Sequence, residues 1–228
     1  HDLDFYTLTT TCCQIDLLDL FHGGFSTGHG VLREPNDIYS YSALACIAIQ
    51  ANQNDQHGGQ SIPNFEYGLA PGVARSFIKN VDLALDMRDA PEDFRKDVKT
   101  ALRKYAFPTG EYASFRSILD KDGLAFVKEQ LMTKLSEKEV SHVIDKAITK
   151  TDKDTYQAME GLIHNLNTMH SRAGAQVPFS SINYGTDTTP EGRMVIKNTL
   201  LAEDAGLGNG ETPIFPIHIF KVREGYSF

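Results

Sequence analysis

The chain has 228 residues, 41% of them hydrophobic and 23% charged, which predicts one globular domain with a sizeable core, or part of a larger one. The formal net charge of −8 argues against a surface that coats nucleic acid, because phosphate neutralisation needs clustered Lys and Arg. No apolar run approaches the roughly 20 residues of a membrane span, and no signal peptide is recognisable, so we expect a cytoplasmic protein without a membrane partner.

Two of the three cysteines are adjacent, in the stretch TTTCCQIDL. Adjacent cysteines can pair only through a strained ring, so we expect free thiols and a reducing compartment. On a β-strand, successive side chains point to opposite faces, and one of Cys12 and Cys13 would then face a buried site while the other packs. The alternative is that each cysteine is a small core residue, which is the commoner role of a buried cysteine.

Short elements are expected up to residue 34, ending in the glycine-rich turn GGFSTGHG. A helix follows, with Asn36 or Asp37 as its cap and apolar residues at helical spacing to about Gln53. The tail of this helix, QANQNDQHGGQS, consists almost entirely of amide, carboxylate and imidazole side chains.

Residues 66–152 are rich in charge and predict helices. The expected helices lie near 70–87, 91–105 and 121–135, and another begins at Ser136, where Glu139 completes a capping box. We interpret this region as a helical insertion that serves as scaffold or dimer surface.

A long helix is expected from Asp152, followed by loop, strand, loop, helix, glycine-rich loop and strand. Thr189 and Pro190 fit the cap and first turn of the second helix, and Gly206 fits its end. The last strand, IFPIHIF, is almost continuously apolar. Apolar strands separated by a helix indicate a sheet covered on at least one face, and hence the α/β class.

An anion site is one interpretation of the segment SINYGTDTTPEGR, which leads from a strand end into a helix N-terminus. Arg193 on the first helical turn favours it, and ordinary capping by Thr189 is the alternative. The glycine-rich stretch GLGNGE, residues 206–211, is weak evidence for a ligand. The histidines lack metal-ligand spacing, so no metal site is expected in this chain.

Five motifs together resemble the anaerobic (class III) ribonucleoside-triphosphate reductases, a family of glycyl-radical enzymes. They are HDLDFYTLTTTCCQIDL, GFSTGHGVLREP, QANQNDQHGGQS, NLNTMHSRAGAQVPFSSINYGTDTTPEGR and GLGNGETPIFPIHIFKV. The resemblance covers most of the chain outside residues 66–152. It implies that residues 1–228 are one catalytic-barrel fragment, the N-terminal half of a ten-stranded α/β barrel, with 66–152 as a helical insertion.

The resemblance also implies a reaction, in which ribonucleoside triphosphates become deoxyribonucleoside triphosphates for DNA synthesis. In that family a C-terminal glycyl radical generates a thiyl radical on a finger-loop cysteine, which removes the ribose 3′ hydrogen. The 2′ hydroxyl leaves as water, and a second cysteine on the first barrel strand delivers a hydrogen. This chain has no cysteine after Cys46 and no RVxGY-like glycyl site, so we expect it to hold no cofactor and to need the rest of an enzyme.

Partners and effectors are implied in the same way. The family resemblance implies a homodimer, a radical-SAM activating enzyme, a structural zinc in the complete enzyme, and control by ATP and deoxynucleoside triphosphates. The negative net charge argues against a nucleic-acid partner. Two alternatives stay open: a non-catalytic deoxynucleotide-sensing module, and another glycyl-radical lyase.

The site residues are carried over from the resemblance position by position. Cys12 is the expected hydrogen donor, Cys13 is the alternative, and His1 lies on the reductant side. Gln50, Gln53 and Gln56 are candidate effector contacts on a dimer-interface helix. The candidates for substrate binding are Ser171, Arg172, Gln176, Ser180, Ser181, Asn183, Thr189 and Arg193.

Overall fold

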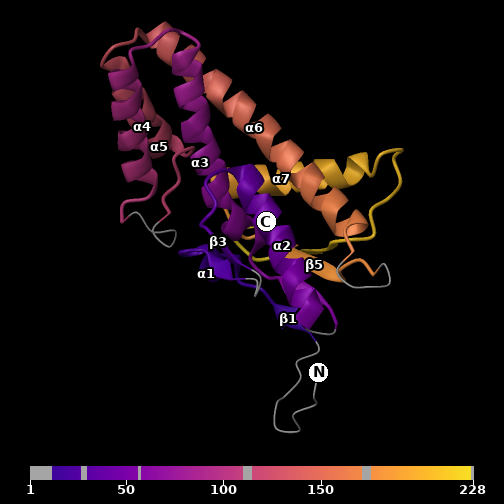
Figure 1. Cartoon of the computed structure of the whole chain (residues 1–228). Coiled ribbons are helices and arrows are strands. Elements are labelled where there is room, and N and C mark those ends of the chain that lie inside the picture. The colour runs from indigo at the N-terminus through magenta and orange to yellow at the C-terminus, as the bar shows by residue number, and fades with distance from the viewer. Residues whose placement is uncertain (1–11, 27–29, 56–57, 110–114, 171–175, 227–228) are drawn as a thin grey trace.

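The computed structural model describes residues 12–26, 30–55, 58–109, 115–170 and 176–226 (Figure 1). The strands are β1 (Cys13–Gln14), β2 (Phe25–Ser26), β3 (Val31–Leu32), β4 (Gln60–Ile62), β5 (Ser180–Tyr184) and β6 (Ile217–Phe220). The helices are α1 (Leu17–Phe21), α2 (Ile38–Asp55), α3 (Phe65–Asp86), α4 (Glu92–Ala106), α5 (Lys121–Met132), α6 (Glu137–Thr168) and α7 (Pro190–Ala205).

Four strands form a parallel sheet in the order β1-β4-β5-β6, and β2 pairs with β3 in a small antiparallel hairpin. Parallel neighbours need crossover connections, and helices supply them: α3 to α6 lie between β4 and β5, and α7 lies between β5 and β6. The expected α/β class is therefore confirmed. The continuation of these strands into a ten-stranded barrel stays a prediction.

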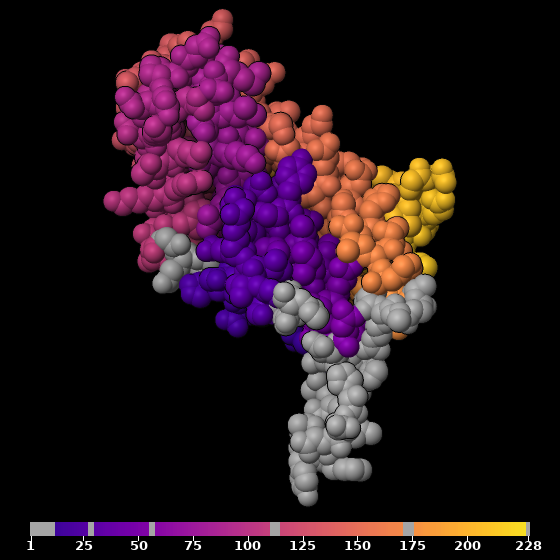
Figure 2. Space-filling view, viewed as in Figure 1, coloured from indigo at the N-terminus to yellow at the C-terminus, as the bar shows by residue number. Residues whose placement is uncertain are grey.

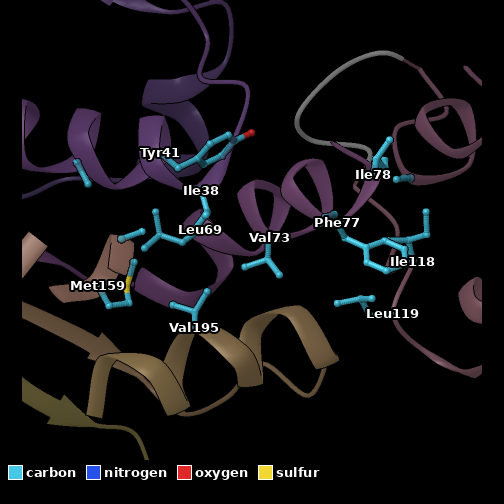
Figure 3. Packing of buried hydrophobic residues seen from close by; sticks show 14 of the residues in the cluster. Ile38, Tyr41, Leu69, Val73, Phe77, Ile78, Ile118, Leu119, Met159 and Val195 are labelled. Atoms are coloured by element: carbon cyan, nitrogen blue, oxygen red, sulfur yellow. The ribbon is translucent and has the colours of Figure 1, made fainter. Parts of the chain in front are cut away.

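The core lies between the sheet and the helices, and α3 is its centre. Leu69 and Val73 on α3 are fully buried between Tyr41 of α2 and Val195 of α7 (Figure 3). Close approach is possible because α3 carries glycine where its neighbours pack: a Cβ at position 72 would lie 2.8 Å from the Tyr41 ring. The part of α3 nearest the sheet is thus packed against both α2 and α7.

The far ends of α3 and α6, together with α4 and α5, extend away from the sheet as a helical projection (Figure 1). In the space-filling view this projection is the lobe at the upper left (Figure 2). Its predicted capping box is confirmed, because Ser136 donates its backbone N–H to Glu139 Oε2 at 2.9 Å. Among the described residues, no helix has both the length and the apolar character to cross a membrane.

Two helix boundaries differ from the sequence-based expectation. Helix α3 begins at Phe65, about five residues early, and contains Pro71 in its second turn. Helix α6 is continuous from Glu137 to Thr168, so the two helices expected to begin at Ser136 and Asp152 are one. Residue 152, the expected end of the helical insertion, lies inside α6. The division of the chain at 66 and 152 stays a prediction.

Candidate functional site

The two faces of the parallel sheet differ in what covers them. The register places Cys13, Gln60 and Ser180 side by side on one face, which packs against the helices. Ile62, Ile182 and Tyr184 follow on this covered face and are all buried. The alternate residues form the open face, which is exposed or half-buried throughout: Gln14, Ser61, Ser181, Asn183, Ile217 and Ile219.

The open face is mostly polar on its first three strands. Ser61 Oγ donates to Asn183 Oδ1 at 3.3 Å, which links β4 to β5. Ser181, two residues before Asn183 on β5, pairs with Ser61 in the register. Two predicted substrate contacts, Ser181 and Asn183, therefore lie on one surface. A third, Ser180, has the opposite orientation and is buried on the covered face.

The adjacent cysteines divide between solvent and core. Cys12, directly before β1, is exposed, whereas Cys13 is half-buried and packs against the hydrophobic core. The Cys13 thiol lies 3.6 Å from the carbonyl oxygen of Gln14. One thiol thus packs while its neighbour is exposed, and the expectation that one of the pair faces a buried site stays a prediction. All three cysteines are free.

Cys46 has a different environment from the other two thiols. It lies on α2 and is 2% exposed, with its sulfur 3.9 Å from the carbonyl oxygen of Leu162. Burial raises the pKa of the Cys46 thiol to about 12, because the thiolate would lose its hydration. Cys46 is therefore a small core residue and not a reactive thiol.

The loop after β5 is fixed by a buried carboxylate. Glu66, the second residue of α3, is fully buried, and its Oε1 accepts the backbone N–H groups of Gly185, Thr186 and Asp187 at 2.8, 3.0 and 3.2 Å. Gly185 has φ +124°, and a Cβ there would lie 2.7 Å from the carbonyl oxygen of Lys221. These three backbone donors at the end of β5 therefore bind an internal carboxyl group and are not free for a substrate anion.

The start of α7 is capped by its own sequence. Thr189 accepts the N–H of Gly192 at 3.1 Å through its side chain, and its own N–H donates to Asp187 Oδ1 at 2.8 Å. Burial raises the pKa of Asp187, although the Thr189 N–H opposes this shift. Arg193 is exposed and donates to the carbonyl oxygen of Tyr226 at 3.3 Å. The structure thus shows the capping role of Thr189, and its role in phosphate binding stays a prediction.

A second buried carboxylate, Glu191 on the first turn of α7, fastens the segment before α5. It accepts the Ser117 hydroxyl at 2.6 Å and the N–H groups of Ile118 and Leu119 at 2.8 and 3.0 Å. Burial raises the pKa of Glu191, and these hydrogen bonds oppose the shift. Neither Glu66 nor Glu191 was identified from sequence.

The amide-rich end of α2 lies against the start of β4. Gln53 is 1% exposed, and Asn52 donates to the side-chain oxygen of Gln60. The Gln50 amide nitrogen is buried without a hydrogen-bond partner among the described residues. Two of the three predicted effector contacts, Gln50 and Gln53, therefore point at least partly inward.

Several predicted residues cannot be placed in this site. His1, Gln56, Ser171 and Arg172 lie outside the described residues. Gln176 is exposed in a short bridge before β5. In the part of the chain that the structure describes, no three His, Cys, Asp or Glu side chains are arranged to hold a metal ion.

Residues at the β6 end were also missed from sequence. Asn167 near the end of α6 accepts the N–H groups of Ile214 and Phe215 at 2.9 and 3.1 Å, and so positions the entry to β6. On the covered face, the Tyr184 hydroxyl lies 3.0 Å from His218 Nδ1. These contacts join segments more than 30 residues apart in sequence, so no local sequence pattern predicts them.

Comparison with known proteins identifies the family. The family model described as anaerobic ribonucleoside-triphosphate reductase matches residues 1–228. The chain belongs to this family. The anaerobic ribonucleoside-triphosphate reductase of Enterobacteria phage T4 is 26% identical over 230 residues, and those of Salmonella typhimurium and Escherichia coli are 25% and 26% identical. Each alignment covers the whole of this chain, which spans only 25% to 29% of the relatives' length.

Proposed function

We propose that this chain is the N-terminal half-barrel of a longer anaerobic reductase polypeptide, which converts ribonucleoside triphosphates to deoxyribonucleoside triphosphates. The observation that carries this proposal is the open face of a parallel sheet, with Cys12 at its edge. The polar side chains of Ser61, Ser181 and Asn183 would line the interior of a barrel once further strands extend the sheet. Helices on the other face keep the wall rigid.

Cys12 is the proposed hydrogen donor, because it is the exposed thiol of the adjacent pair. Its S–H bond would break homolytically, and the hydrogen atom would form a C–H bond on the substrate ribose. The resulting sulfur radical would then need a reductant, either formate or a thiol protein. A glycyl radical elsewhere in the full-length polypeptide, installed by a radical-SAM activase, would supply the radical that begins the reaction.

Substrate binding would involve the open face and the segment before it. Ser181 and Asn183 can hydrogen-bond ribose hydroxyls, since a hydroxyl and an amide each donate and accept. The phosphates would bind elsewhere than residues 185–187, because Glu66 occupies those donors. Arg193, His1, Ser171 and Arg172 remain proposed contacts from the family resemblance.

Assembly and control are proposed on the same family basis. The full-length polypeptide would be a cytoplasmic homodimer with a structural zinc outside this chain. ATP and deoxynucleoside triphosphates would act as effectors near the amide-rich end of α2. Family membership favours the reductase over the sensing module and over another glycyl-radical lyase.

The test is reduction of CTP by the full-length polypeptide, activated under anoxia. We expect Cys12→Ala to abolish deoxynucleotide formation, because Cys12 is the only exposed thiol among the described residues. Cys13→Ala should retain part of the rate, since that thiol is packed. If both variants reduce CTP at nearly the normal rate, the assignment of the hydrogen donor to this pair is wrong.

A further inference from the structure

Strand β6 is reached through a long irregular connection. Helix α7 ends at Ala205 and β6 begins at Ile217, so residues 206–216 lie between them. A tight turn between two strands fixes which residues pair, but a connection of this length does not. Contacts from another part of the chain must therefore determine where β6 begins to pair with β5.

The side-chain amide of Asn167, in the last turn of α6, holds the end of this connection. Its Oδ1 accepts the N–H groups of Ile214 and Phe215 at 2.9 and 3.1 Å. Its Nδ2 donates to the carbonyl oxygens of Phe215 and Ile163 at 2.5 and 2.7 Å. An amide side chain offers two donors and two acceptor sites, so Asn167 uses all four. Phe215, two residues before β6, is thus held through both its N–H and its carbonyl oxygen.

The register of β6 decides which of its side chains reach the open face. Ile217 pairs with Ser181, which lies on the open face, and the next residue, His218, pairs with Ile182 on the covered face. A shift of β6 by one residue would exchange these faces, because side chains alternate along a strand. His218 would then lie beside Ser181, and an apolar part of the open face would become polar.

Asn167 also lies at the start of the connection to β5. Helix α6 ends at Thr168, and β5 begins at Ser180. The rings of Phe179, directly before β5, and Phe215 meet edge to face with centroids 5.2 Å apart. Three of the candidate substrate contacts belong to the same connection: Ser171, Arg172 and Gln176. Asn167 thus joins the start of one connection to the end of the other.

We propose that Asn167 is a positioning residue for ribonucleotide reduction, an inference that rests on the proposed function. Asn167 acts through β6 and not by contact with the substrate. By holding Phe215 it sets the register that keeps Ile217 beside Ser181, on the face where the ribose lies. The effect falls on substrate binding more than on hydrogen transfer, because β6 and β1, which follows Cys12, are at opposite edges of the described sheet.

The test measures kcat and KM for CTP with the full-length polypeptide, activated under anoxia. We expect Asn167→Ala to raise KM roughly 5- to 50-fold, because all four hydrogen bonds at the entry to β6 are lost. The value of kcat should change by less than about 3-fold, since the hydrogen donor is not displaced. Asn167→Asp keeps the two accepted hydrogen bonds and loses the two donated ones. Its KM should also rise, and it replaces the alanine variant if that variant does not fold.

Thr168→Ala is the matched control. Thr168 is the next residue of α6, and its hydroxyl donates to the carbonyl oxygen of His164 at 2.7 Å, within the same helix. Both kcat and KM should equal the wild-type values. If Thr168→Ala raises KM as much as the Asn167 variants do, loosening of the helix end explains the effect and the inference is wrong.

Hydrogen exchange measures the register without requiring activity. The Lys221 N–H donates to the carbonyl oxygen of Tyr184 at 2.7 Å, directly after β6. Its exchange should be faster in the Asn167 variants than in the wild type and in Thr168→Ala. Unchanged exchange in the Asn167 variants would overturn the inference, because β6 would then keep its register without Asn167.

The kinetic outcomes separate the two proposals. A KM within about 2-fold of the wild-type value in both Asn167 variants would contradict the positioning role. A fall in kcat with unchanged KM would also contradict it, since β6 would then not shape the binding face. If the activated wild type does not reduce CTP, the proposed function itself fails, whatever the exchange of Lys221 shows about the register.

Discussion

The two faces of the sheet are built from neighbouring residues with different tasks. Cys12 and Cys13, like Ser180 and Ser181, are adjacent pairs of one residue type, yet in each pair one residue is the more buried and its neighbour the more exposed. The covered face adds Ile62, Ile182 and Tyr184, and its role is packing. The open face contributes little buried area and keeps its polar groups accessible, so its residues are available for chemistry.

Because adjacent residues of a strand lie on opposite faces, we expect substitutions at neighbouring positions to affect stability and activity separately. A substitution on the covered face should change the free energy of unfolding. A substitution on the open face should change turnover while the fold survives.

The largest effect on stability is expected for Ile182→Ala against Asn183→Ala on β5. Ile182 is fully buried, and removing its side chain should cost about 2–5 kcal/mol. Asn183 is half-buried on the open face, and its substitution should change stability by no more than about 0.5 kcal/mol while deoxynucleotide formation falls. Hydrogen exchange of the β5 amides measures the first effect locally, and equal protection in the two variants would contradict the division into faces.

The two buried carboxylates sharpen the comparison, because each binds a loop but only one adjoins the open face. Glu66→Gln and Glu191→Gln each lose charge-assisted hydrogen bonds, and each should cost about 1–3 kcal/mol locally. Exchange should accelerate at Gly185, Thr186 and Asp187 in the first variant, and at Ile118 and Leu119 in the second.

Activity then distinguishes the two variants. Glu66→Gln should raise the KM for the ribonucleotide, because the end of β5 is no longer fixed beside Asn183. Glu191→Gln is the control and should leave KM unchanged. A rise in KM for both variants would mean that general loosening of α7, and not the β5 loop, controls substrate binding.

The sequence predicts much of this fold because many of its signals are local. The capping box at Ser136, the cap and first turn at Thr189 and Pro190, and the helix end at Gly206 are each confirmed. Such signals depend on residues within one turn of each other, so they survive in the folded protein regardless of tertiary context.

The features that sequence reasoning missed all depend on distant partners. Glu66 and the loop it binds are about 120 residues apart, and Glu191 and its loop are about 70 apart. In the sequence, a glutamate that becomes buried looks like any surface glutamate until the chain folds. The helix start at Phe65 was missed for a related reason: Pro71 resembles a helix beginning, and only packing of Leu69 and Val73 fixes the earlier turn.

The division of Ser180 from Ser181 was available from sequence. The stretch SSINY alternates, and its apolar members Ile182 and Tyr184 share a face with Ser180 by the period of two. Treating both serines as lining residues overlooked that period.

A smaller effect concerns His218 on the covered face. Burial lowers the pKa of His218 below its ordinary 6.5, and although Glu203 Oε2 lies 3.4 Å from Nε2, the atoms are not aligned for a hydrogen bond. Burial also raises the pKa of Glu203, which weakens it as a counter-charge. The folded state therefore favours the neutral form of His218. The contribution of this residue to folding stability is complete above pH 6.5 and is lost as the pH falls below that value.

Substituting His218 should remove part of this loss of folding stability at low pH. Between about pH 8 and pH 5.5, the midpoint of thermal unfolding should fall less steeply for His218→Gln than for the wild type. His142→Gln is the control, because His142 is exposed on the helical projection and should leave the slope unaltered. A His218→Gln slope equal to the wild-type slope would show that protonation at this position does not oppose folding.

The smallest expected change in stability is at Ser180, and its sign is informative. The Ser180 hydroxyl is buried without a partner, so Ser180→Ala should stabilise the ligand-free polypeptide by up to about 1 kcal/mol. Ser181→Ala on the open face should show no gain in stability. If Ser180→Ala instead destabilises the polypeptide, another segment of the full-length protein satisfies the Ser180 hydroxyl, and the expected sign is wrong.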